Sequence, residues 1–200
     1  MRKIRILSHI SLDGVIQAPG GRGEGGDDYE HGGWTAPFRG AAGAEAVAEA
    51  QGRHFDLLLG RRTYDIFAGH WPKASGPLAN GLNAATKYVA THRPEGLEWG
   101  PVGDLGTDVM QGVRRVKSED GSDLIVWGSG ALATALLGQG LVDEVSLFVY
   151  PVVVGRGKRF FEDGDDPREL ALVRTKALSS GVLMNTYRYV GSLRTSDRAP

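Results

Sequence analysis

The chain of 200 residues contains no cysteine. This absence excludes disulfide bonds, thiolate catalysis and every zinc site built on cysteine ligands. The five histidines, at positions 9, 31, 54, 70 and 92, do not have the spacing of metal ligands either. We therefore expect no metal site, and the cytoplasm is the default compartment for a chain with no disulfides.

Long apolar runs and an excess of charge are also missing. No stretch is long and apolar enough to span a bilayer, and the first eight residues alternate like a strand rather than forming the apolar core of a signal peptide. The net charge is -1, so the chain has no general positive field for nucleic acid or an anionic membrane. These absences favour a small-molecule partner over nucleic acid or a membrane.

Glycine, in contrast, is abundant, at 30 residues. Residues 18–33 contain seven glycines and several acids, and are expected to form a long mobile loop that is either a lid over a site or a plain surface insertion. No linker divides the chain. We expect one domain over residues 1–190, followed by a flexible tail over 191–200.

The hydrophobic pattern alternates between strands and helices. It predicts strands at 3–11, 55–59, 87–91, 124–127 and 143–154, helices at 43–52, 61–67, 76–85, 107–117 and 130–137, and a closing antiparallel pair at 170–178 and 182–190. In the first helix Ala44, Val47 and Ala48 are expected to face inward, and Thr107 is expected to cap the fourth. This order indicates an α/β fold with a mostly parallel sheet and antiparallel C-terminal strands.

The stretch from Asp123 to Leu137 reads as a buried strand, a glycine turn and a helix. Gly128 and Gly130 allow a ligand to approach the main chain, and Ser129 is expected to cap the helix. The first N–H groups of such a helix point toward a place where a phosphate can bind. The motif alone leaves phosphate binding undecided, because similar turns occur without ligands.

Two familiar nucleotide sites do not fit. A dinucleotide fingerprint should occur in the first strand–helix–strand unit and be followed by an acid at the end of the next strand, yet this motif starts at Gly128 and the next strand ends in Val154-Gly155-Arg156. The P-loop motif is absent from the sequence. A second phosphate candidate, Gly60-Arg61-Arg62-Thr63, follows the strand at 55–59 and combines two guanidinium groups with a helix start. One basic site and one backbone site together favour NADP(H) over NAD(H).

Five short motifs carry a family resemblance. They are Ser11-Leu-Asp13-Gly14-Val-Ile16, Gly60-Arg-Arg-Thr-Tyr64, Val126-Trp-Gly128-Ser-Gly130, Leu141-Val-Asp143-Glu144 and Pro151-Val-Val-Val-Gly155-Arg-Gly157-Lys-Arg-Phe-Phe161. In this order, over about residues 3–190, the chain resembles the C-terminal reductase domain of the riboflavin-biosynthesis deaminase/reductase. His31-Gly-Gly-Trp34 resembles the stand-alone members of this superfamily.

The resemblance implies a three-layer α/β/α fold like that of dihydrofolate reductase, and NADPH-dependent reduction of a small pterin- or pyrimidine-like substrate. By position, Arg61, Arg62 and Thr63 would hold the adenosine-side phosphate and part of the pyrophosphate, with Thr91 and Arg93 beside the ribose and adenine. Gly128, Ser129, Gly130, Ala131 and Leu132 would cradle the pyrophosphate. The resemblance also implies a homodimer, to which the apolar strand at 145–154 is a candidate contributor.

The chain departs from the family at several positions. Riboflavin-pathway reductases usually carry Glu-Gly-Gly where this chain has Trp127-Gly128-Ser129, which argues against their ribosylaminopyrimidine substrate. The zinc-binding deaminase domain is not expected, because the chain has no cysteine. Dihydrofolate reductases carry a substrate-binding carboxylate in the first long helix. Here Glu45 and Glu49 lack the surrounding pattern, so folate reduction is unsupported.

Two residues are candidates for catalysis. Asp13, near the nicotinamide by resemblance, is either a proton source or a turn residue before Gly14, and Trp34 either stacks on a flat substrate or packs at a helix start.

Three alternatives to an NADPH-dependent reductase stay open. They are a flavin-using oxidoreductase on the same pocket, a protein that binds NADPH without turnover, and a structural dimerisation domain.

Overall fold

The structure is a computed structural model that describes residues 1–26, 29–162 and 164–193. Within these residues the strands are β1 (Ile4–Ser11), β2 (Phe55–Gly60), β3 (Lys87–Ala90), β4 (Val102–Gly103), β5 (Asp123–Trp127), β6 (Glu144–Tyr150), β7 (Arg168–Ala177) and β8 (Leu183–Ser192). The α-helices are α1 (Ala41–Gln51), α2 (Arg61–His70), α3 (Pro77–Ala84), α4 (Val109–Ser118) and α5 (Gly130–Gly138). Short 3-10 turns are η1 (Arg22–Gly25), η2 (Ala36–Phe38) and η3 (Trp71–Lys73).

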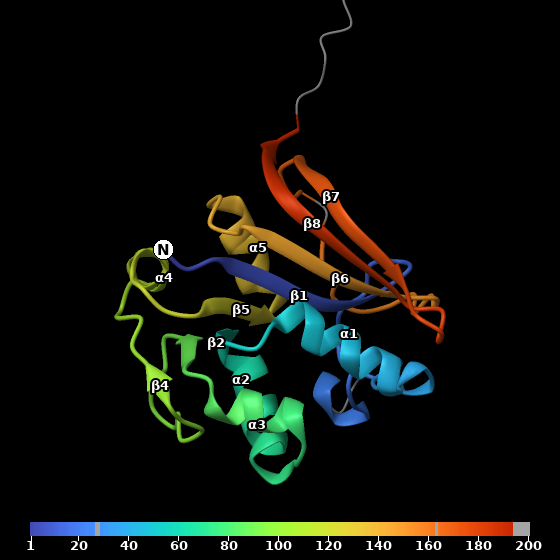
Figure 1. The fold of residues 1–200 in the computed structure, drawn as a ribbon, viewed down its shortest axis with the longest axis horizontal. Coiled ribbons are helices and arrows are strands. Elements are labelled where there is room, and N and C mark those ends of the chain that lie inside the picture. Colours follow the sequence, from blue (N-terminus) through green and yellow to red (C-terminus); the bar gives the residue numbers. More distant parts are fainter. Residues whose placement is uncertain (27–28, 163, 194–200) are drawn as a thin grey trace, which may run out of the picture.

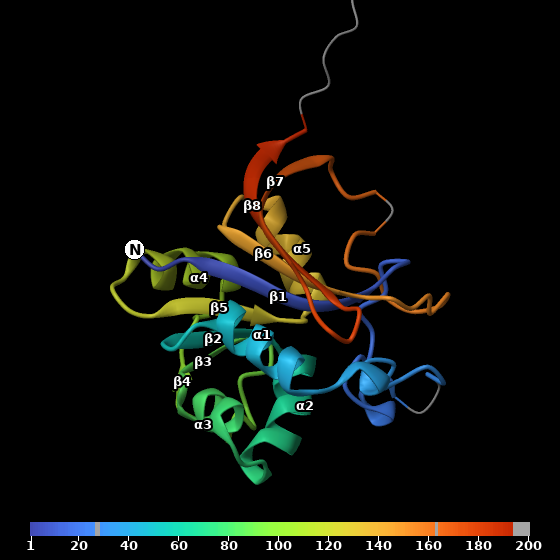
Figure 2. The same cartoon turned by 45° about the vertical axis from the view of Figure 1, so that its right-hand side comes forward.

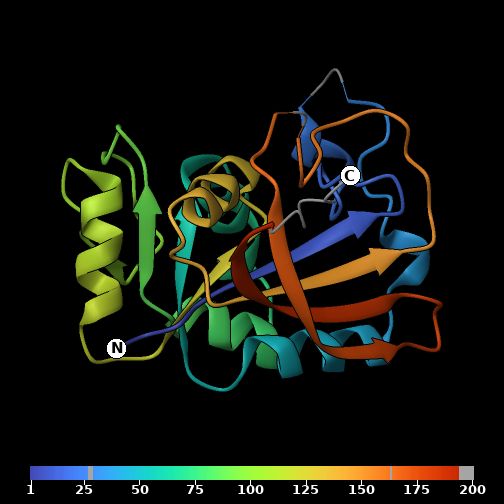
Figure 3. The same cartoon turned by 90° about the horizontal axis from the view of Figure 1, so that it is seen from above.

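The strands form one sheet in the order β4-β3-β2-β5-β1-β6-β8-β7 (Figure 1). Strands β1 to β6 pair in parallel, and β8 and β7 close the sheet in antiparallel pairing. Seen from above, the long β7–β8 pair occupies the edge opposite β4 (Figure 3). The predicted sheet is therefore confirmed. The two-residue strand β4 was not predicted, because two residues carry no periodic pattern.

Helices cover both faces of the sheet (Figure 2). Alternate side chains of each strand point to opposite faces, so Leu57 and Leu59 pack with α1, α2 and α3, while Leu58 packs with α4 and α5. A parallel sheet covered in this way has buried strands on both faces. The predicted three-layer α/β/α fold is confirmed.

Two predictions about the helices were wrong. Helix α1 buries Ala46 and Ala50 against the sheet, whereas Ala44 and Ala48 are exposed, because a helix of alanines gives little signal for its inward face. Only Val47 of the predicted inward set packs against the core. Helix α4 is capped by the carboxylate of Asp108, which accepts a hydrogen bond from the Gln111 N–H at 3.0 Å, and not by Thr107. Asp is as good an N-cap as Thr, and the two residues are adjacent.

The strand predicted at 143–154 ends at Tyr150, because Pro151 follows and lacks an N–H for the ladder. Strand β6 lies between β1 and β8, and most of its side chains are buried. The strand itself is therefore interior, whereas Val153, in the part of the expected contributor that lies beyond β6, is exposed. The homodimer stays a prediction. At the other end of the chain, β8 continues to Ser192, and residues 194–200 of the expected tail lie outside the described residues.

The described parts of the glycine-rich segment at 18–33 are more structured than the sequence predicted; Asp27 and Asp28 lie outside the described residues. The Gly33 N–H donates to the Ala18 carbonyl at 2.8 Å, and the Thr35 hydroxyl donates to the Pro19 carbonyl at 2.5 Å. Gly32 approaches the backbone of Arg22 so closely that a Cβ there would lie 2.7 Å from the Arg22 Cα. These contacts close the segment at its base, beside the carboxyl ends of the central strands (Figure 2).

Across the described ranges, the helices are too short or too polar for any of them to cross a bilayer. Those residues also contain no group of three or more His, Asp or Glu side chains placed to hold a metal ion.

Candidate active site

A cavity of about 1810 Å³ opens at the carboxyl ends of the central strands. Its walls come from the second half of β1, the last residues of β2, β5 and β6, the first turns of α2 and α5, one face of α1, the loop at 16–24 and the turn near Lys158. In α/β sheets ligands bind at this end of the strands. The volume exceeds the several hundred Å³ typical of a pocket for one small ligand, so the cavity has room for two.

The predicted phosphate turns after β2 and β5 meet in this cavity and are joined by Ser129. Its hydroxyl oxygen accepts a hydrogen bond from the Gly60 N–H at 3.0 Å, and lies 2.9 Å from the Thr63 Oγ1 and 3.0 Å from the Trp127 carbonyl as possible acceptors. Ser129 stands at the N-cap position of α5, but its backbone is left-handed at φ 49° and its side chain does not cap the helix. The expected capping role was wrong, because the neighbouring strand competes for the hydroxyl.

Gly128 has the open backbone that a ligand cradle needs. Its φ is +53°, which favours glycine, and no atom lies within 4 Å of the place where a Cβ would stand. Gly130, Ala131 and Leu132 follow in the first turn of α5 and also line the cavity. The N–H groups of such a turn have no intrahelical acceptors.

Arg61, Arg62 and Thr63 all line the cavity at the start of α2, but the two arginines differ. The Arg61 guanidinium bonds to the Asp65 carboxylate at 2.8 Å and to the carbonyls of Arg93 and Glu95 at 2.6 and 2.9 Å. Arg62 is exposed and donates to the Glu24 carbonyl at 3.1 Å. Arg61 thus holds the turn after β3, whereas Arg62 is the more available cation.

Of the two residues predicted beside the adenosine, Thr91 lines the cavity and Arg93 does not. The Thr91 hydroxyl accepts a hydrogen bond from the Arg93 N–H at 3.0 Å and so shapes this turn. Arg93 is exposed, and its carbonyl is used by Arg61. The structure brings Thr91, but not the Arg93 side chain, to the predicted cofactor residues.

The other end of the cavity is aromatic, and its main polar group was not predicted. The His9 ring lies 5.6 Å from that of Trp127, 5.3 Å from Phe148 and 5.4 Å from Tyr150. The His9 Nδ1 is 3.0 Å from the Tyr150 hydroxyl. The sequence did contain a signal for His9. Side chains alternate between the two faces of β1, so His9 lies on the face opposite Ile4, Ile6 and Ile10, near the carboxyl end of the strand.

Burial keeps both members of this His–Tyr pair neutral near pH 7. Burial, and to a lesser degree the positive charge of Arg39, lower the pKa of His9 to about 4. Burial raises the pKa of Tyr150 to about 12, although Arg39 opposes the shift. His9 is nevertheless partly accessible, and the accessible part faces the cavity because His9 is one of its lining residues.

Asp13 lies outside the cavity lining and holds the turn after β6. Its carboxylate accepts hydrogen bonds from the Ser11 hydroxyl at 2.6 Å and from the N–H groups of Val154 and Gly155 at 3.0 and 2.7 Å. The hydrogen bond from Ser11 is the largest cause that lowers the pKa of Asp13 to about 2; desolvation opposes it, and the two N–H groups add to the lowering. An ionised, fully bonded carboxylate is a poor proton source, so the geometry supports the turn-residue alternative.

Trp34 also lies behind the cavity and not in its lining. Its indole N–H donates to the Gln17 carbonyl at 2.9 Å, and its ring packs edge-on against Tyr150 at 5.4 Å. Trp127 does line the cavity, and its indole N–H donates to the Gln51 side chain at 2.9 Å. Trp34 therefore supports Tyr150, while Trp127 is the indole that a ligand would meet.

Helix α1 turns small residues toward the cavity, namely Gly40 at its start, Gly43, Ala44 and Val47. The acids of this helix point elsewhere. Glu49 forms ion pairs with Arg174 and with Lys176, the latter at 2.9 Å, and Glu45 is exposed. Neither acid lines the cavity, so the described helix offers no carboxylate to a substrate there.

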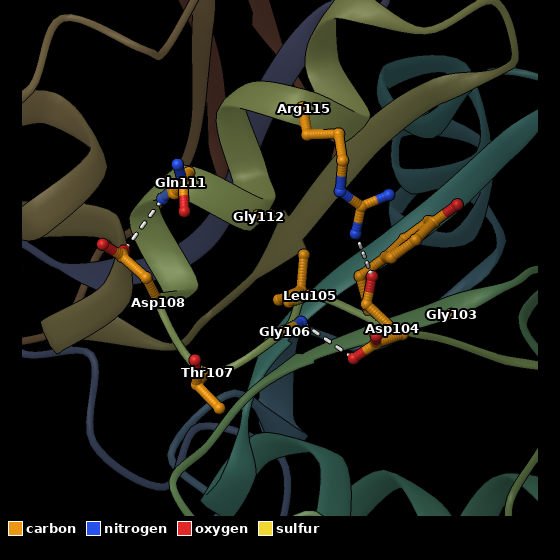
Figure 4. A pocket seen from close by; sticks show the side chains of 10 residues that line it. Gly103, Asp104, Leu105, Gly106, Thr107, Asp108, Gln111, Gly112 and Arg115 are labelled. Atoms are coloured by element: carbon orange, nitrogen blue, oxygen red, sulfur yellow. Dashed lines mark hydrogen bonds between the residues drawn. The ribbon is translucent and has the colours of Figure 1, made fainter.

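A second hollow, of about 660 Å³, lies between β4 and α4 (Figure 4). Its polar groups already bond to one another: Arg115 donates to the Asp104 carbonyl at 2.7 Å, and the Gly106 N–H donates to the Asp104 carboxylate at 2.8 Å. It contains none of the predicted site residues. The larger cavity is therefore the candidate active site.

Comparisons with known proteins agree with this architecture. The chain is 29% identical over 140 residues to the uncharacterised protein YyaP of Bacillus subtilis, a match that covers 68% of this chain and 74% of YyaP. It is 25% identical over 187 residues to the uncharacterised YwjB of the same organism, covering 94% of this chain and 98% of YwjB.

Similar solved structures include a pyrimidine reductase-like protein from Corynebacterium diphtheriae, with a TM-score of 0.60 and 14% identity over 94% of this chain and 92% of that one. A deaminase/5-amino-6-(5-phosphoribosylamino)uracil reductase from Thermotoga maritima gives a TM-score of 0.60 at 12% identity, covering 94% of this chain but 57% of the larger protein. A putative riboflavin biosynthesis protein from Shewanella gives 0.57 at 17% identity, covering 94% and 99%. At these identities the likeness concerns the fold. Residues 2–184 match the RibD C-terminal domain, and the chain belongs to that family.

Proposed function

We propose that this protein is a cytoplasmic oxidoreductase that uses NADPH to reduce a small heterocyclic substrate. The observation that carries the proposal is one continuous cavity that runs from the paired turns after β2 and β5 to the aromatic end at His9. Membership of the RibD C-terminal domain family and the reductases among its structural neighbours support a reductase.

The residues of the two turns fit the phosphates of the cofactor. Gly128 leaves its main chain open, Arg62 offers a cation, and the first turns of α2 and α5 line the cavity, where their N–H groups are candidates to bind a phosphate. NADPH supplies the hydride when it is bound. The chain's own residues bind the phosphates, exclude water and hold the substrate at the aromatic end.

The test is a titration with NADPH and NADH, monitored by calorimetry. We expect tighter binding of NADPH, and the double variant Arg61→Ala/Arg62→Ala should lose roughly 10- to 100-fold in NADPH affinity, because a hydrogen bond to a charged group contributes about 1.5–3 kcal/mol. Arg53→Ala/Arg188→Ala, which removes two exposed arginines outside the cavity, is the matched control. NADPH affinity that survives the first change would contradict the assignment of the turns.

Turnover is tested by NADPH oxidation across a panel of pterins, pyrimidines and quinones. Binding without oxidation of the cofactor would favour a protein that senses NADPH, and failure to bind either dinucleotide would favour a structural domain. A yellow colour of the purified protein would favour a flavin, which the aromatic walls of the cavity could also take.

We also propose that the chain forms a homodimer through the β7–β8 edge. Leu172, Val173, Leu183 and Val190 expose large apolar side chains on these two strands. Several exposed apolar side chains on neighbouring strands at one edge of a sheet make that edge a candidate interaction surface. Light scattering should give a dimer for the native chain and a monomer for Leu172→Glu/Val173→Glu, and a native monomer would overturn the proposal.

A further inference from the structure

The Trp127 indole, which lines the cavity, is held from behind by a buried glutamine. Gln51 is the last residue of α1, and its side chain accepts a hydrogen bond from the Trp127 indole N–H at 2.9 Å. Gln51 is only 3% exposed and is not one of the residues that line the cavity. The bond therefore lies behind the cavity wall, where a ligand does not reach it.

The end of α1 is fixed to the sheet by Arg5 of β1. The Arg5 guanidinium donates to the carbonyls of Ala50 and Gln51 at 2.9 and 2.7 Å. Its Nε lies 3.4 Å from the Asp123 carboxylate, at the start of β5. A basic side chain at this end of a helix satisfies carbonyls that have no intrahelical partner. Arg5 thereby sets where Gln51 stands relative to β5, the strand that ends at Trp127.

On its other side, the Trp127 ring packs against His9. The two ring centroids are 5.6 Å apart, and the ring planes are tilted by 34°. Burial is the main reason that the pKa of His9 is about 4; the charge of Arg39 acts in the same direction, and the Tyr150 hydroxyl bonds to Nδ1. The pKa of His9 therefore reports whether Trp127 stays in place.

The hydrogen bond decides which way the indole turns. Gln51 is the acceptor of the Trp127 N–H among the described residues. A buried N–H group that loses its acceptor is unfavourable, because it gives up the bond without regaining water. Trp127 lines the cavity, so turning the ring toward the cavity is the way in which its N–H would reach water. Without Gln51 the ring would leave His9 and take up part of the cavity.

We propose that Gln51 is a positioning residue that holds the Trp127 indole against His9 as a fixed part of the cavity wall, and so sets the space left for a substrate beside it. The glutamine acts through the tryptophan and touches no ligand. The consequence for a substrate rests on the proposed function, whereas the hold on the ring does not.

The hold on the ring is tested by NMR of the full chain labelled with ¹⁵N, in which each of the four tryptophans gives one indole N–H signal. Trp127→Phe identifies the signal of Trp127. In Gln51→Met, which keeps an unbranched side chain that favours a helix, this signal should shift. The pKa of His9, followed by its ring protons, should rise from about 4 toward 6.5 as water reaches the ring. Gln51→Glu keeps an acceptor oxygen and should restore the indole signal.

Asn83→Leu is the matched control. The Asn83 side chain accepts a hydrogen bond from the Trp99 indole N–H at 2.8 Å, and neither residue lines the cavity. This change should move the signal of Trp99 and leave both the signal of Trp127 and the pKa of His9 as they are. A double variant adds a second check. Because Trp127→Phe has no N–H, adding Gln51→Met to it should not change the pKa of His9 further.

Kinetics test the consequence for a substrate. With a pterin, pyrimidine or quinone that the chain reduces, Gln51→Met should raise KM roughly 2- to 10-fold and change kcat less, because the substrate has to move the ring back at about the net contribution of one hydrogen bond. Asn83→Leu should change neither constant. If the chain reduces none of these compounds, the proposed function is contradicted, and the NMR measurements still decide the role of Gln51.

Three results would overturn the proposal. They are an unmoved Trp127 signal in Gln51→Met, an unmoved pKa of His9 in that variant, and a further rise of this pKa when Gln51→Met is added to Trp127→Phe. An unchanged KM in a variant whose ring has moved would overturn the consequence for the substrate. Thermal unfolding confirms that each variant folds. If Gln51→Met does not, Gln51→Asn, which keeps the amide but is one methylene shorter, should give the same shifts.

Discussion

At one end of the cavity, the residues proposed to bind the cofactor come from two contiguous turns, at 60–63 and 128–132. At the other end, His9, Phe38, Trp127 and Tyr150 come from four separate segments and meet only in the fold. The first end uses the backbone and arginines, which suit phosphates of any ligand. The second uses aromatic rings and a neutral His–Tyr pair, which distinguish one ring from another. Cofactor binding and substrate choice are therefore expected to respond to different substitutions.

The largest expected effect is a loss of NADPH affinity in Gly128→Ala, and Gly140→Ala serves as the control for backbone strain. Gly128→Ala puts a methyl group into the open space of the turn, and both Gly128 and Gly140 have positive φ with no atom near the Cβ position. Each alanine variant should lose about 1–2 kcal/mol of stability through left-handed strain. Gly128→Ala alone should also lose roughly 10- to 100-fold in NADPH affinity, as expected when a charged hydrogen bond is lost. Equal NADPH affinity in the two variants, measured by calorimetry, would show that the turn does not hold the cofactor.

A second comparison concerns the arginines of the basic turn. Arg62→Ala should reduce NADPH affinity by about 10-fold and leave NADH affinity nearly unchanged, because Arg62 is the more available cation. Arg61→Ala should instead lower the thermal unfolding temperature, since Arg61 holds the carbonyls of Arg93 and Glu95. Arg93→Ala serves as the control, as its side chain is outside the cavity lining. A change of cofactor preference in Arg93→Ala would restore the role that the sequence assigned to it.

At the aromatic end, the expected effect is on stability at acid pH. His9 has an ordinary pKa of 6.5 and a pKa of about 4 in the folded chain, so the unfolded chain binds more protons between these values. The stability that neutral His9 contributes is complete above pH 6.5 and is lost as the pH falls toward 4, by up to about 3 kcal/mol. His9→Gln should reduce this loss in thermal unfolding across that window. The carboxylate of Asp13 titrates at lower pH, so an equal loss in both chains would contradict the assignment to His9.

The smallest expected effect on turnover is at Asp13. Asp13→Asn weakens the bonds that hold the turn after β6 and should lower the unfolding temperature. Turnover per folded molecule should change little, because the carboxylate lies outside the cavity lining. A residue that donates the catalytic proton increases the reaction rate roughly 10²–10⁴-fold. A loss of that size in kcat, measured by steady-state kinetics, would show that Asp13 acts as the proton source.

The contrast between contiguous turns and an aromatic end built from separate segments also explains which parts of the site could be predicted from the sequence. The turns were predicted because glycines, arginines and a helix start are adjacent in the chain, and because strand periodicity indicated where the sheet ends. Arg93 was misplaced because the side-chain direction of a residue in a turn has no periodic signal. The His9–Tyr150 contact was not predicted, because it depends on the parallel register of β1 and β6, in which Ser11 lies opposite Tyr150. The pairing register of two strands that are far apart in the sequence cannot be predicted from the sequence of either strand alone.

The loop at 16–26 is bonded to both ends of the cavity. Its Glu24 carbonyl accepts a hydrogen bond from Arg62, and its Gly20 carbonyl accepts one from Arg39. If an Arg62 N–H turned to a phosphate, or an Arg39 N–H to a substrate, it would leave its loop carbonyl. We therefore expect cofactor and substrate each to compete with this loop for an arginine donor, which would couple the release of the loop to binding at both ends of the cavity.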